Sequence, residues 1–558
     1  MPYNSKDWVI EKSTTDYLAS LKSVSSLPSR RMRAEQLHAV NDTHFRNENA
    51  GRNKGEKLRV PDNITPWQVA KLIAATEPIR CIRCVNDSSN NEYDILGLYQ
   101  SDGPKAGTYD TDELTISALI REYLHEITEN GIQSVIKQLR EEVPHVARCC
   151  DPDIIAVNNG LFNFKTKTLE PFSPDKVFLS KSHVDYNPNA TNVVIHNNDD
   201  GTDWDVESWI LELANDDPDI ENSIWEIISA ICRPFVRWNK AAFFYSTTGN
   251  NGKGTLCVLM RNLVGSSSCA SISLAEFSKD FVLEPLITAS CIIVDENDVG
   301  EYIDKAGSMK ACITGDTIQI NRKYKIPVYY QFHGMMVQCI NDMPRIRDKS
   351  NSFYRRQIFV PFEKCFTGAE RQYIKSDYLY RQDVLEYVLY KALHMSHYTL
   401  SVPAASAAVM EEYKLNNDPI REFCDEILPE LKWDLAPFQF LFDMYLSWFS
   451  HNQPSGGVQR RNTFIRDLIE VVKERDDWIY PGKTSDNRHC RFLGAGNMNG
   501  PEPLIIQYNL EDWMNKNYTG GMNTDKICTF QPGSTRYPGI IRANSPLAAS
   551  LTQGGNTP

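Results

Sequence analysis

One stretch of the sequence constrains the fold more than any other, because it places a short apolar strand, a glycine-rich loop and an apolar-periodic helix in succession. The strand AAFFYST runs into TGNNGKGT, and the helix LCVLMRNLVG follows with Leu256, Leu259 and Leu263 at helical spacing. Glycines let consecutive backbone N–H groups converge on one point, and the N-terminus of the helix adds a dipole that favours an anion. The pattern therefore predicts a phosphate-binding loop between a buried strand and a helix.

The residues of this loop that we expect to contact a nucleotide are Gly249, Asn250, Asn251, Gly252, Lys253, Gly254 and Thr255. Lys253 is expected to reach the β- and γ-phosphates, and the Thr255 hydroxyl to help hold Mg²⁺. Two positions depart from the commonest pattern, since Thr247 replaces the first glycine and Gly254 follows the lysine where a hydroxyl usually stands. A glycine-rich turn with a solvated lysine is the alternative.

A second apolar strand, predicted over residues 291–294 in SCIIVDENDVG, ends at two carboxylates, Asp295 and Glu296. P-loop enzymes use a buried strand with acidic residues at its C-terminal end to place a Mg²⁺ partner and a residue that polarises water. We expect Asp295 to hold the metal through water and Glu296 to orient the attacking water. Together with the loop upstream, this strand predicts an NTP hydrolase core that uses ATP and Mg²⁺.

A third strand, GMMVQCINDMP, ends at Asn341, where a polar side chain could sense the γ-phosphate and the lytic water. Beyond it, Arg355 and Arg356 precede another apolar strand. An arginine supplied across a subunit boundary would stabilise charge on the transferred phosphoryl group. Ordinary surface ion pairs are the alternative for both arginines, and the spacing does not decide which would be the finger, although we favour Arg355.

Between the carboxylate strand and the asparagine strand, INRKYKIPVYYQF predicts a basic hairpin. Its expected DNA-binding residues are Arg322, Lys323, Tyr324 and Lys325, with Lys310 facing the same region. Cations neutralise phosphates and an aromatic ring can stack on a base. The alternative is a solvated edge hairpin whose charges discourage strand pairing.

The overall composition is that of a globular protein, with 41% hydrophobic and 23% charged residues and a net charge of −13. The acidic balance argues against a surface coated in basic residues, although it leaves room for a local basic channel. No apolar run approaches the roughly 18 residues that span a bilayer, and the first residues lack a signal-peptide pattern. The scattered cysteines are typical of reduced, buried thiols, so we expect a cytoplasmic protein. Cys81-x-x-Cys84 has no matching second pair, which favours buried thiols over zinc.

The predicted architecture is a multidomain α/β chain. Its parts are a polar segment over 1–75, interpreted as mobile and solvated rather than as a DNA-contacting arm; a mixed α+β domain over 76–203; two amphipathic helices over 204–238, split at Asp217-Pro218; an α/β core over 239–400; a linker over 401–417; a helix-rich domain with a strand-like end over 418–531; and a partly mobile tail over 532–558.

The set of loop, Asp-Glu strand, asparagine strand and arginine resembles the superfamily 3 helicases, in particular the poxvirus- and phage-type primase-helicase branch. Further likeness lies in FSKDFVLEPLITASCIIVDEND, in SMKACITGDTIQINRKYKIPVYYQFHGMMVQCINDMPRIRD and in IAVNNGLFNFKTKTLEPFSPDKVFLSKSHVDYNP. The resemblance covers roughly residues 90–400, more weakly the C-terminal domain, and not the first 75.

The resemblance implies a P-loop, AAA+-like ATPase core with an N-terminal domain of the primase-helicase type, a helical collar over 204–238 and a small winged-helix-like C-terminal domain. It implies a ring, usually hexameric, that moves 3′ to 5′ on single-stranded or forked DNA during replication, in a phage, plasmid or mobile element. The sequence shows no clear primase signature, so we expect a separate primase or polymerase. Two other functions share parts of the pattern: a DNA-dependent ATPase that loads origins or packages DNA without unwinding, and a small-molecule or nucleoside kinase.

Overall fold

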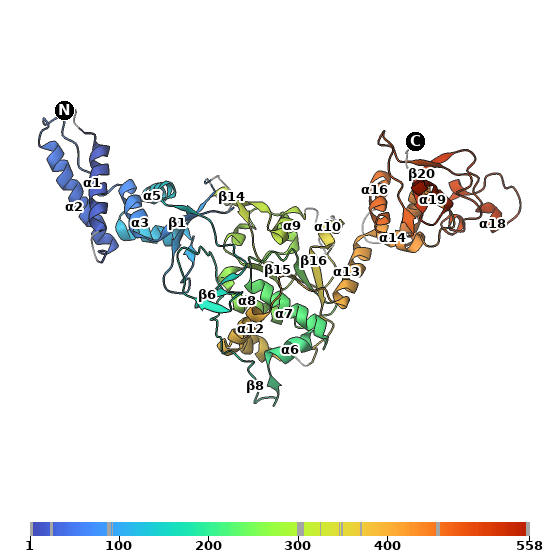
Figure 1. Ribbon diagram of the computed structural model, residues 1–558, viewed down its shortest axis with the longest axis horizontal. Helices are drawn as coiled ribbons and strands as arrows, with labels where there is room; N and C mark the ends of the chain where they lie inside the picture. The colour runs from blue at the N-terminus through green and yellow to red at the C-terminus, as the bar shows by residue number, and fades with distance from the viewer. Residues whose placement is uncertain are drawn as a thin grey trace. The chain divides into compact units, whose positions relative to one another are not determined.

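The computed structural model describes residues 4–22, 26–85, 91, 93–297, 306–323, 325–344, 346, 350–368, 371–452 and 458–553. The chain is a mixed α/β, multidomain protein (Figure 1). It divides into two compact units, Met1–Ala407 and Ala408–Pro558. The predicted Tyr324 lies outside the described residues.

Three helices begin the first unit: α1 (Lys6–Leu21), α2 (Arg30–Asn49) and α3 (Pro66–Thr76). Each begins after a hydroxyl N-cap, Ser5, Ser29 or Thr65, whose side chain accepts an N–H of the first turn. Buried side chains such as Leu37 and Ile73 join α2 and α3 to one hydrophobic core. The expectation of a mobile, solvated segment over residues 1–75 is therefore wrong for the described part of that segment.

The composition of this segment is misleading because several of its polar side chains are buried. Asn41 is fully buried; it accepts a hydrogen bond from Ser13 Oγ at 2.6 Å and donates to Gln68 Oε1 at 3.1 Å. The Gln68 amide in turn donates to Thr14 Oγ1 at 2.9 Å. Buried polar groups that find partners cost little, so a sequence that looks hydrophilic still packs as a helical core.

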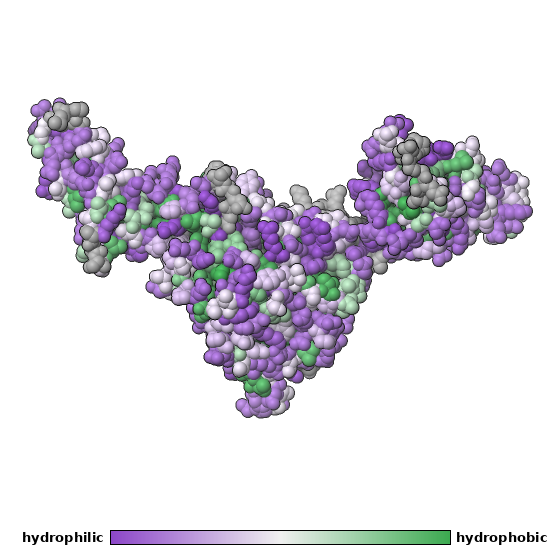
Figure 2. Space-filling model, in the orientation of Figure 1, coloured by the Kyte–Doolittle hydropathy of each residue, from purple (hydrophilic) through white to green (hydrophobic). Residues whose placement is uncertain are grey.

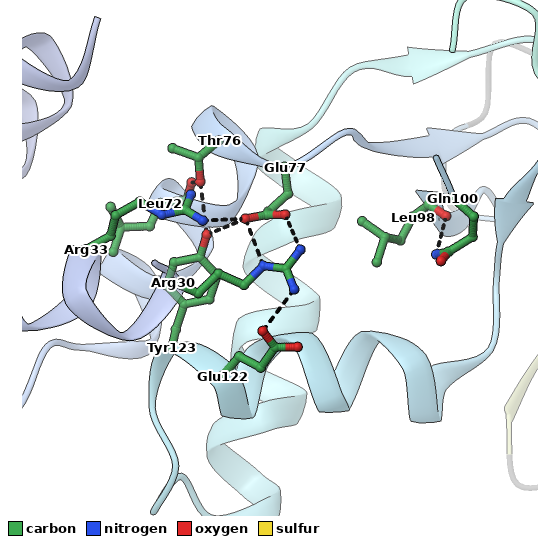
Figure 3. Close-up of polar contacts among 9 residues, drawn as sticks. All are labelled: Arg30, Arg33, Leu72, Thr76, Glu77, Leu98, Gln100, Glu122 and Tyr123. Atoms are coloured by element: carbon green, nitrogen blue, oxygen red, sulfur yellow. Dashed lines mark hydrogen bonds and ion pairs between the residues drawn. The ribbon is translucent and has the colours of Figure 1, made fainter. Parts of the chain in front are cut away.

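A buried carboxylate, Glu77, ties α2 and α3 to α4 (Glu113–Tyr123) (Figure 3). It accepts hydrogen bonds from Arg30 Nη2 at 2.7 Å, from Arg33 Nη2 at 2.9 Å and from the Tyr123 hydroxyl at 2.7 Å. Arg30 also pairs with Glu122 at 2.9 Å. These two arginines belong to the basic run SRRMR, so their charges are neutralised inside the protein rather than offered to DNA.

Three small sheets, two of them wholly antiparallel, complete the described region before the core. The first is a four-stranded sheet in the order β3-β2-β1-β4, with β1 (Ile79–Ile82), β2 (Ile95–Tyr99), β3 (Tyr109–Asp110), a parallel β4 (His145–Val146), and the helices α4 (Glu113–Tyr123) and α5 (Glu129–Glu142). The second joins β5 (Ile154–Val157), β6 (Gly160–Asn163) and β7 (Thr168–Glu170), and a further pair joins β8 (Ile195–His196) to β9 (Asp203–Trp204). A mixed α+β arrangement before the core agrees with the prediction.

The two helices expected over 204–238 are α6 (Val206–Leu213) and α7 (Pro218–Cys232). Proline at the first position of α7 and Asp217 at its N-cap set the break, as the sequence predicts. Ile224, Ile228 and Ile231 of α7 belong to the same hydrophobic core as the sheet residues Val337 and Ile358. These helices therefore pack as a layer of the core, and their role as a collar stays a prediction.

The core is a five-stranded, wholly parallel sheet in the order β11-β12-β15-β10-β16. Its strands are β10 (Ala241–Tyr245), β11 (Cys269–Ala270), β12 (Cys291–Val294), β15 (Met335–Ile340) and β16 (Gln357–Pro361), and α8 (Lys253–Val264), α7 and α12 (Gln382–His394) pack together beside it. A parallel sheet is covered on its faces, and the buried strands here follow that rule. The strand predicted over 291–294 is confirmed.

The remaining elements of the first unit connect these strands. They are η1 (Ser266–Ser268), η2 (Leu274–Ser278), η3 (Glu284–Ile287), α9 (Gly307–Thr314), the antiparallel hairpin β13 (Thr317–Arg322) and β14 (Lys325–Gln331), α10 (Asn351–Tyr354), α11 (Gln372–Ser376) and η4 (Tyr378–Tyr380). The predicted hairpin is thus present.

The second unit follows α13 (Ala404–Asn417), which spans the division between the units. Its elements are α14 (Pro419–Ile427), β17 (Leu435–Pro437), α15 (Phe438–Asn452), α16 (Arg461–Val472), β18 (Trp478–Ile479), β19 (Arg491–Leu493), α17 (Leu504–Gln507), η5 (Glu511–Trp513), α18 (Thr524–Ile527), β20 (Arg536–Arg542) and α19 (Pro546–Gln553). Whether it works as a winged helix stays a prediction.

The expected mobile tail over 532–558 is wrong for its described part. Strand β20 pairs with β17, β18 and β19, so it holds the small sheet together. Ile540 and Ile541 are fully buried in the core of the second unit. The Pro/Gly/Ser-rich flanks hide a short apolar strand, GIIR, that composition alone does not reveal.

The surface is mainly hydrophilic on the face shown in Figure 2, where hydrophobic residues form small separate patches. Large exposed hydrophobic side chains, such as Leu114 and Met522, occur singly along the chain. Among the described residues, no helix has both the length and the apolar character needed to cross a bilayer.

Candidate functional site

Three neighbouring strands of the parallel sheet end at the predicted site. In the register of the sheet, Tyr245 of β10 stands opposite Ile340 of β15, and Val294 of β12 stands opposite Gln338. The glycine-rich loop, Asp295 and Asn341 follow directly after these strands, so all three leave the same edge. In open parallel sheets, ligands bind outside this carboxyl edge.

The glycine-rich loop adopts backbone angles that favour its own residue types. Gly252 has a φ of 81° and Asn250 a φ of 55°, both in the left-handed region. A Cβ atom at Gly252 would lie 2.3 Å from Leu213 Cδ2, so that position requires glycine. Helix α8 begins at the next residue and no described side chain caps it, which leaves its first N–H groups for another acceptor.

Lys253 is buried, with 5% of its surface exposed, and it has no carboxylate partner among the described residues. Its Nζ donates to Asn251 Oδ1 at 2.9 Å, and Asn251 itself donates to the carbonyl of Thr248. Burial lowers the pKa of Lys253 below its ordinary value. An ammonium that is desolvated and lacks an anion is costly, so the loop fits a phosphate group.

The carboxylate pair at the end of β12 lies beside an arginine that the sequence analysis missed. Arg261 of α8 donates from Nη2 to Asp295 Oδ1 at 2.9 Å and to the Ile293 carbonyl at 3.2 Å. The hydrogen bond from Arg261 lowers the pKa of Asp295, so this residue is an ionised carboxylate. Glu296 is exposed at the same edge. Arg261 sits on α8 two turns after Lys253, but nothing in the sequence links it to the distant Asp295.

A second missed residue, Asn297, fixes the turn that carries Glu296. Its Nδ2 donates to Gln338 Oε1 and to the Cys339 carbonyl, each at 3.0 Å, and its Oδ1 accepts from the Leu274 N–H at 2.9 Å. Glu296 therefore stands between two residues with fixed side chains. The DEND sequence placed Asn297 next to the pair, yet its partners lie on other elements.

The two candidate finger arginines are not brought to this site within one chain. They precede β16, whose first residue, Gln357, pairs with Ala241 at the start of β10, so they lie at the opposite edge of the sheet from Lys253. Arg356 donates to Ser352 Oγ at 2.5 Å, whereas Arg355 is exposed and its guanidinium pairs with no described side chain. This favours Arg355 as the residue available to a neighbouring protomer.

A pocket of about 290 Å³ adjoins the glycine-rich loop. Its lining includes Trp209, Leu213, Phe366 and Ile374, together with Gly252 and Thr255 of the loop. The segment after β16 closes over the loop, because the Phe366 N–H donates to the Asn250 carbonyl at 2.8 Å. Apolar walls beside a phosphate-type loop suit a flat ring. Sequence reasoning missed this pocket because its walls come from distant segments.

The basic hairpin lies on the same unit but its cations are partly engaged. Arg322 pairs with Glu284 at 3.2 Å and Lys325 pairs with Glu113 at 3.0 Å. Lys323 is exposed near the turn, and Lys310 lies half-buried on α9. Tyr324 falls outside the described residues, so its stacking role stays a prediction.

The cysteine pair that raised the question of zinc consists of buried thiols. Cys81 Sγ donates to the Arg140 carbonyl and Cys84 Sγ to the Tyr93 carbonyl. Burial raises the pKa of both thiols to about 12. No group of three or more His, Cys, Asp or Glu residues that could hold a metal occurs in the described part of the chain.

Three protein families match separate parts of the sequence. Residues 35–224 match the family described as D5 N terminal like, residues 244–356 match a family of unknown function (DUF5906), and residues 415–498 match the family described as Poxvirus D5 protein-like. The first and third of these bracket the core that contains the predicted loop and strands.

A protein of Acanthamoeba polyphaga mimivirus that is named as a helicase (L207/L206) is 23% identical over 304 residues. The match covers 50% of this chain but only 29% of the mimivirus protein. Two apo structures of the NrS-1 C-terminal region match at 12% and 13% identity with TM-scores of 0.40 and 0.41, covering 73% and 76% of this chain and 86% and 98% of theirs. That likeness is too distant to indicate a function. Over the matched parts, the chain is therefore similar to poxvirus D5-type proteins and to a viral protein that is named as a helicase.

Proposed function

We propose that this protein is an ATP- and Mg²⁺-dependent replicative DNA helicase that works as a ring, usually a hexamer, and moves 3′ to 5′ on single-stranded DNA. One observation carries the proposal. The buried Lys253, which pairs with no carboxylate in the described part of the chain, and the carboxylates of Asp295 and Glu296 leave the same edge of one parallel sheet. A desolvated cation beside two carboxylates suits a phosphate chain with a metal ion, and suits few other ligands.

In this proposal each loop residue has a defined task. The N–H groups at the start of α8 bind phosphate oxygens, and Lys253 binds the β- and γ-phosphates. Thr255 and Asp295 hold the metal, which neutralises charge on the phosphates. Glu296 orients the attacking water, and Asn341, exposed at the end of β15, contacts the γ-phosphate.

The pocket beside the loop gives the nucleotide base a place. It opens next to Thr255, and its apolar residues Trp209 and Phe366 can pack on a purine ring. Arg371 and Gln372 supply polar groups on the same lining. Pockets of this kind fix a ligand with a few polar groups on apolar walls.

The position of Arg355 at the opposite edge of the sheet supports assembly. It cannot reach Lys253 of its own chain, but a neighbouring protomer could present it to the phosphates. We therefore expect Arg355→Ala to lower the rate of ATP hydrolysis on the order of 1,000-fold. Arg356→Ala should lower it less, because the Arg356 side chain is bonded to Ser352 of its own chain.

A mixing experiment tests this division of labour. Arg355→Ala and Lys253→Ala protomers, each inactive alone, should regain hydrolysis when mixed, because some interfaces then combine an intact loop with an intact arginine. Hydrolysis that stays absent in every mixture would place Arg355 outside the site.

Strand displacement on forked DNA with a 3′ or a 5′ tail is the deciding test of the function. Wild type should release the strand with ATP and Mg²⁺ from the 3′-tailed fork, Lys253→Ala should not, and the surface variant Lys12→Ala should match wild type. Hydrolysis stimulated by DNA without displacement would indicate a loading factor or packaging motor. Hydrolysis that ignores DNA would indicate a kinase-like loop and exclude the helicase.

A further inference from the structure

The hairpin of β13 and β14 rests along one side on the domain that precedes the core. The rings of Tyr93 and Tyr329 meet edge to face with centroids 5.1 Å apart. The Gln331 N–H donates to the Cys84 carbonyl at 3.3 Å. Contacts of Tyr329 and Gln331 therefore hold β14 against Tyr93 and Cys84.

Arg148 anchors the end of β14 to the same domain. Its Nη2 donates to the carbonyls of Cys84 at 3.1 Å and Gln331 at 2.9 Å, and its Nη1 donates to the Tyr330 hydroxyl. The guanidinium also lies 4.4 Å from the Tyr330 ring centroid, and Tyr330 donates onward to the Ile287 carbonyl at 2.9 Å. Because Arg148 is 7% exposed, this end of the hairpin is fixed.

Two hollows meet at the free part of the hairpin, and we call them together the hairpin groove. The larger, of about 810 Å³, runs past residues 104–113, 179–183 and 281–288. The smaller, of about 290 Å³, lies between α5 and β14. Both are lined by Glu113, Arg322 and Lys325, so the Glu113–Lys325 ion pair stands where they join.

The smaller hollow carries an excess of positive charge. Its cations are Lys137 and Arg140 from α5 and Arg322 and Lys325 from the hairpin, and its carboxylates are Asp94 and Glu113. Asp94 is already bonded to His145 at 2.5 Å. Lys137 is exposed and pairs with no described carboxylate, and Arg140 Nε is buried without a hydrogen-bond partner among the described residues.

We propose that the hairpin groove binds the phosphate backbone of single-stranded DNA, with Lys137 and Arg140 continuing onto the N-terminal domain the path that Arg322 and Lys325 begin. Glu113 occupies Lys325 until a phosphate replaces it. The proposal rests on the proposed function, because it assigns to the same DNA strand contacts that lie outside the ATPase core. It also gives the preceding domain a direct part in holding the strand.

The ion pair is weak enough to be displaced. The side chains of Lys325 and Glu113 are 38% and 43% exposed, and exposed pairs contribute at most about 1 kcal/mol. A phosphate carries the charge of a carboxylate and releases counterions from DNA when it binds. The half-exposed Tyr329 on β14 offers a face on which a base can stack.

The test uses two substitutions that must act in opposite directions. Binding of fluorescently labelled oligo(dT) to the full-length protein is followed by anisotropy over a range of salt concentrations. Lys137→Ala should weaken binding about 5-fold and reduce the salt slope by about 0.7, the contribution of one phosphate contact to a single strand. Glu113→Gln should tighten binding by a similar factor, because Lys325 then has no competing carboxylate.

Matched controls lie on the helices α1 and α2. Lys12→Ala breaks the exposed Lys12–Asp16 pair and changes the net charge by the same amount as Lys137→Ala. Glu35→Gln breaks the exposed Arg31–Glu35 pair and changes the net charge by the same amount as Glu113→Gln. Both should bind oligo(dT) like wild type. Circular dichroism melting curves that match wild type show that each variant folds.

The possible outcomes separate the two proposals. Wild type that fails to bind oligo(dT) would remove the proposed DNA function and the groove with it. Wild type that binds, with Lys137→Ala equal to Lys12→Ala, would overturn the groove alone. Weaker binding by Glu113→Gln would overturn the proposal that Glu113 competes with DNA for Lys325. The Glu113–Lys325 pair would then hold the hairpin in the position that binds DNA.

Discussion

Two buried charged side chains in the first unit are treated in opposite ways. Glu77 lies between α2, α3 and α4 and receives hydrogen bonds from two arginines and a tyrosine (Figure 3). Lys253 is buried to a similar degree, yet among the described residues its side chain bonds to the neutral amide oxygen of Asn251 and to no carboxylate. One charge is balanced by the protein, and we propose that the other is balanced by a bound phosphate.

The difference separates a structural site from a binding site. A buried ion whose charge is fully paired has no unpaired charge to bind a ligand. Removing one partner leaves the others buried and unpaired, which destabilises the fold. A buried cation without an anion raises the energy of the free protein, and a phosphate that binds there recovers that energy. The hairpin cations are a third case, because partly exposed carboxylates pair with them and, in our proposal, a DNA phosphate can replace such a carboxylate.

The strongest way to break this comparison is to remove the Lys253 charge. Lys253→Met keeps the length and the apolar stem of the side chain, so we expect hydrolysis to fall on the order of 1,000-fold while the melting temperature stays equal or rises. Steady-state hydrolysis and calorimetry measure the two effects, with Lys12→Met as the control. A variant that melts clearly earlier would show that Lys253 also supports the fold.

Removing the Glu77 charge should lower the stability of the helices around it and leave ATP hydrolysis largely unchanged. Glu77→Gln keeps the shape but leaves Arg30 and Arg33 without their anion, and breaking a buried pair costs about 3 kcal/mol. Because a multidomain chain does not unfold in one step, hydrogen–deuterium exchange of peptides from α2 and α3 is the suitable measurement. Their amides should lose protection on the order of 100-fold.

The control for this variant is Glu35→Gln on α2, the helix that carries Arg30 and Arg33. Its pair with Arg31 is exposed on both sides, so the change should stay within about 0.5 kcal/mol. Equal loss of protection in the two variants would mean that the Glu77 cluster carries no special stability. The comparison with Lys253 would then fail on its structural side.

The sequence was sufficient for the elements whose signal is local. The loop, the strand over 291–294, the break at Asp217-Pro218 and the basic hairpin each depend on short patterns of glycine, proline and apolar periodicity. Parallel strands place their carboxyl ends at one edge, so these local patterns also predicted that Lys253, Asp295 and Asn341 leave the sheet together.

The features that the sequence did not reveal depend on contacts between distant segments. Arg261 and Asn297 gain their meaning only from partners on β12, β15 and the segment near Leu274. The polar composition of residues 1–75 suggested a mobile segment, because composition cannot show that Asn41 and Gln68 are hydrogen-bonded to each other inside a core. Strand β20 was missed because a short apolar run is bracketed by residues typical of loops.

His333 shows a further way to bury an ionisable group, which is to discharge it, and it gives the smallest of the expected effects. Burial, aided by the charges of Arg148 and Arg237, lowers the pKa of His333 from 6.5 to about 4. Its ring packs against Phe235 with centroids 5.7 Å apart. The folded protein therefore keeps this imidazole neutral through the pH range in which the unfolded chain protonates it.

The sign of the pH effect follows from these values. Between pH 6.5 and about 4 the unfolded chain binds more protons at this residue than the folded protein does, so stability is complete above pH 6.5 and falls as the pH drops. The loss at pH 5 is about 2 kcal/mol. Calorimetry from pH 7 to pH 5 should show a shallower decline for His333→Gln than for wild type, because glutamine cannot take up the proton. Parallel declines in the two proteins would place the acid sensitivity elsewhere and show that His333 is already accessible to protons in the folded state.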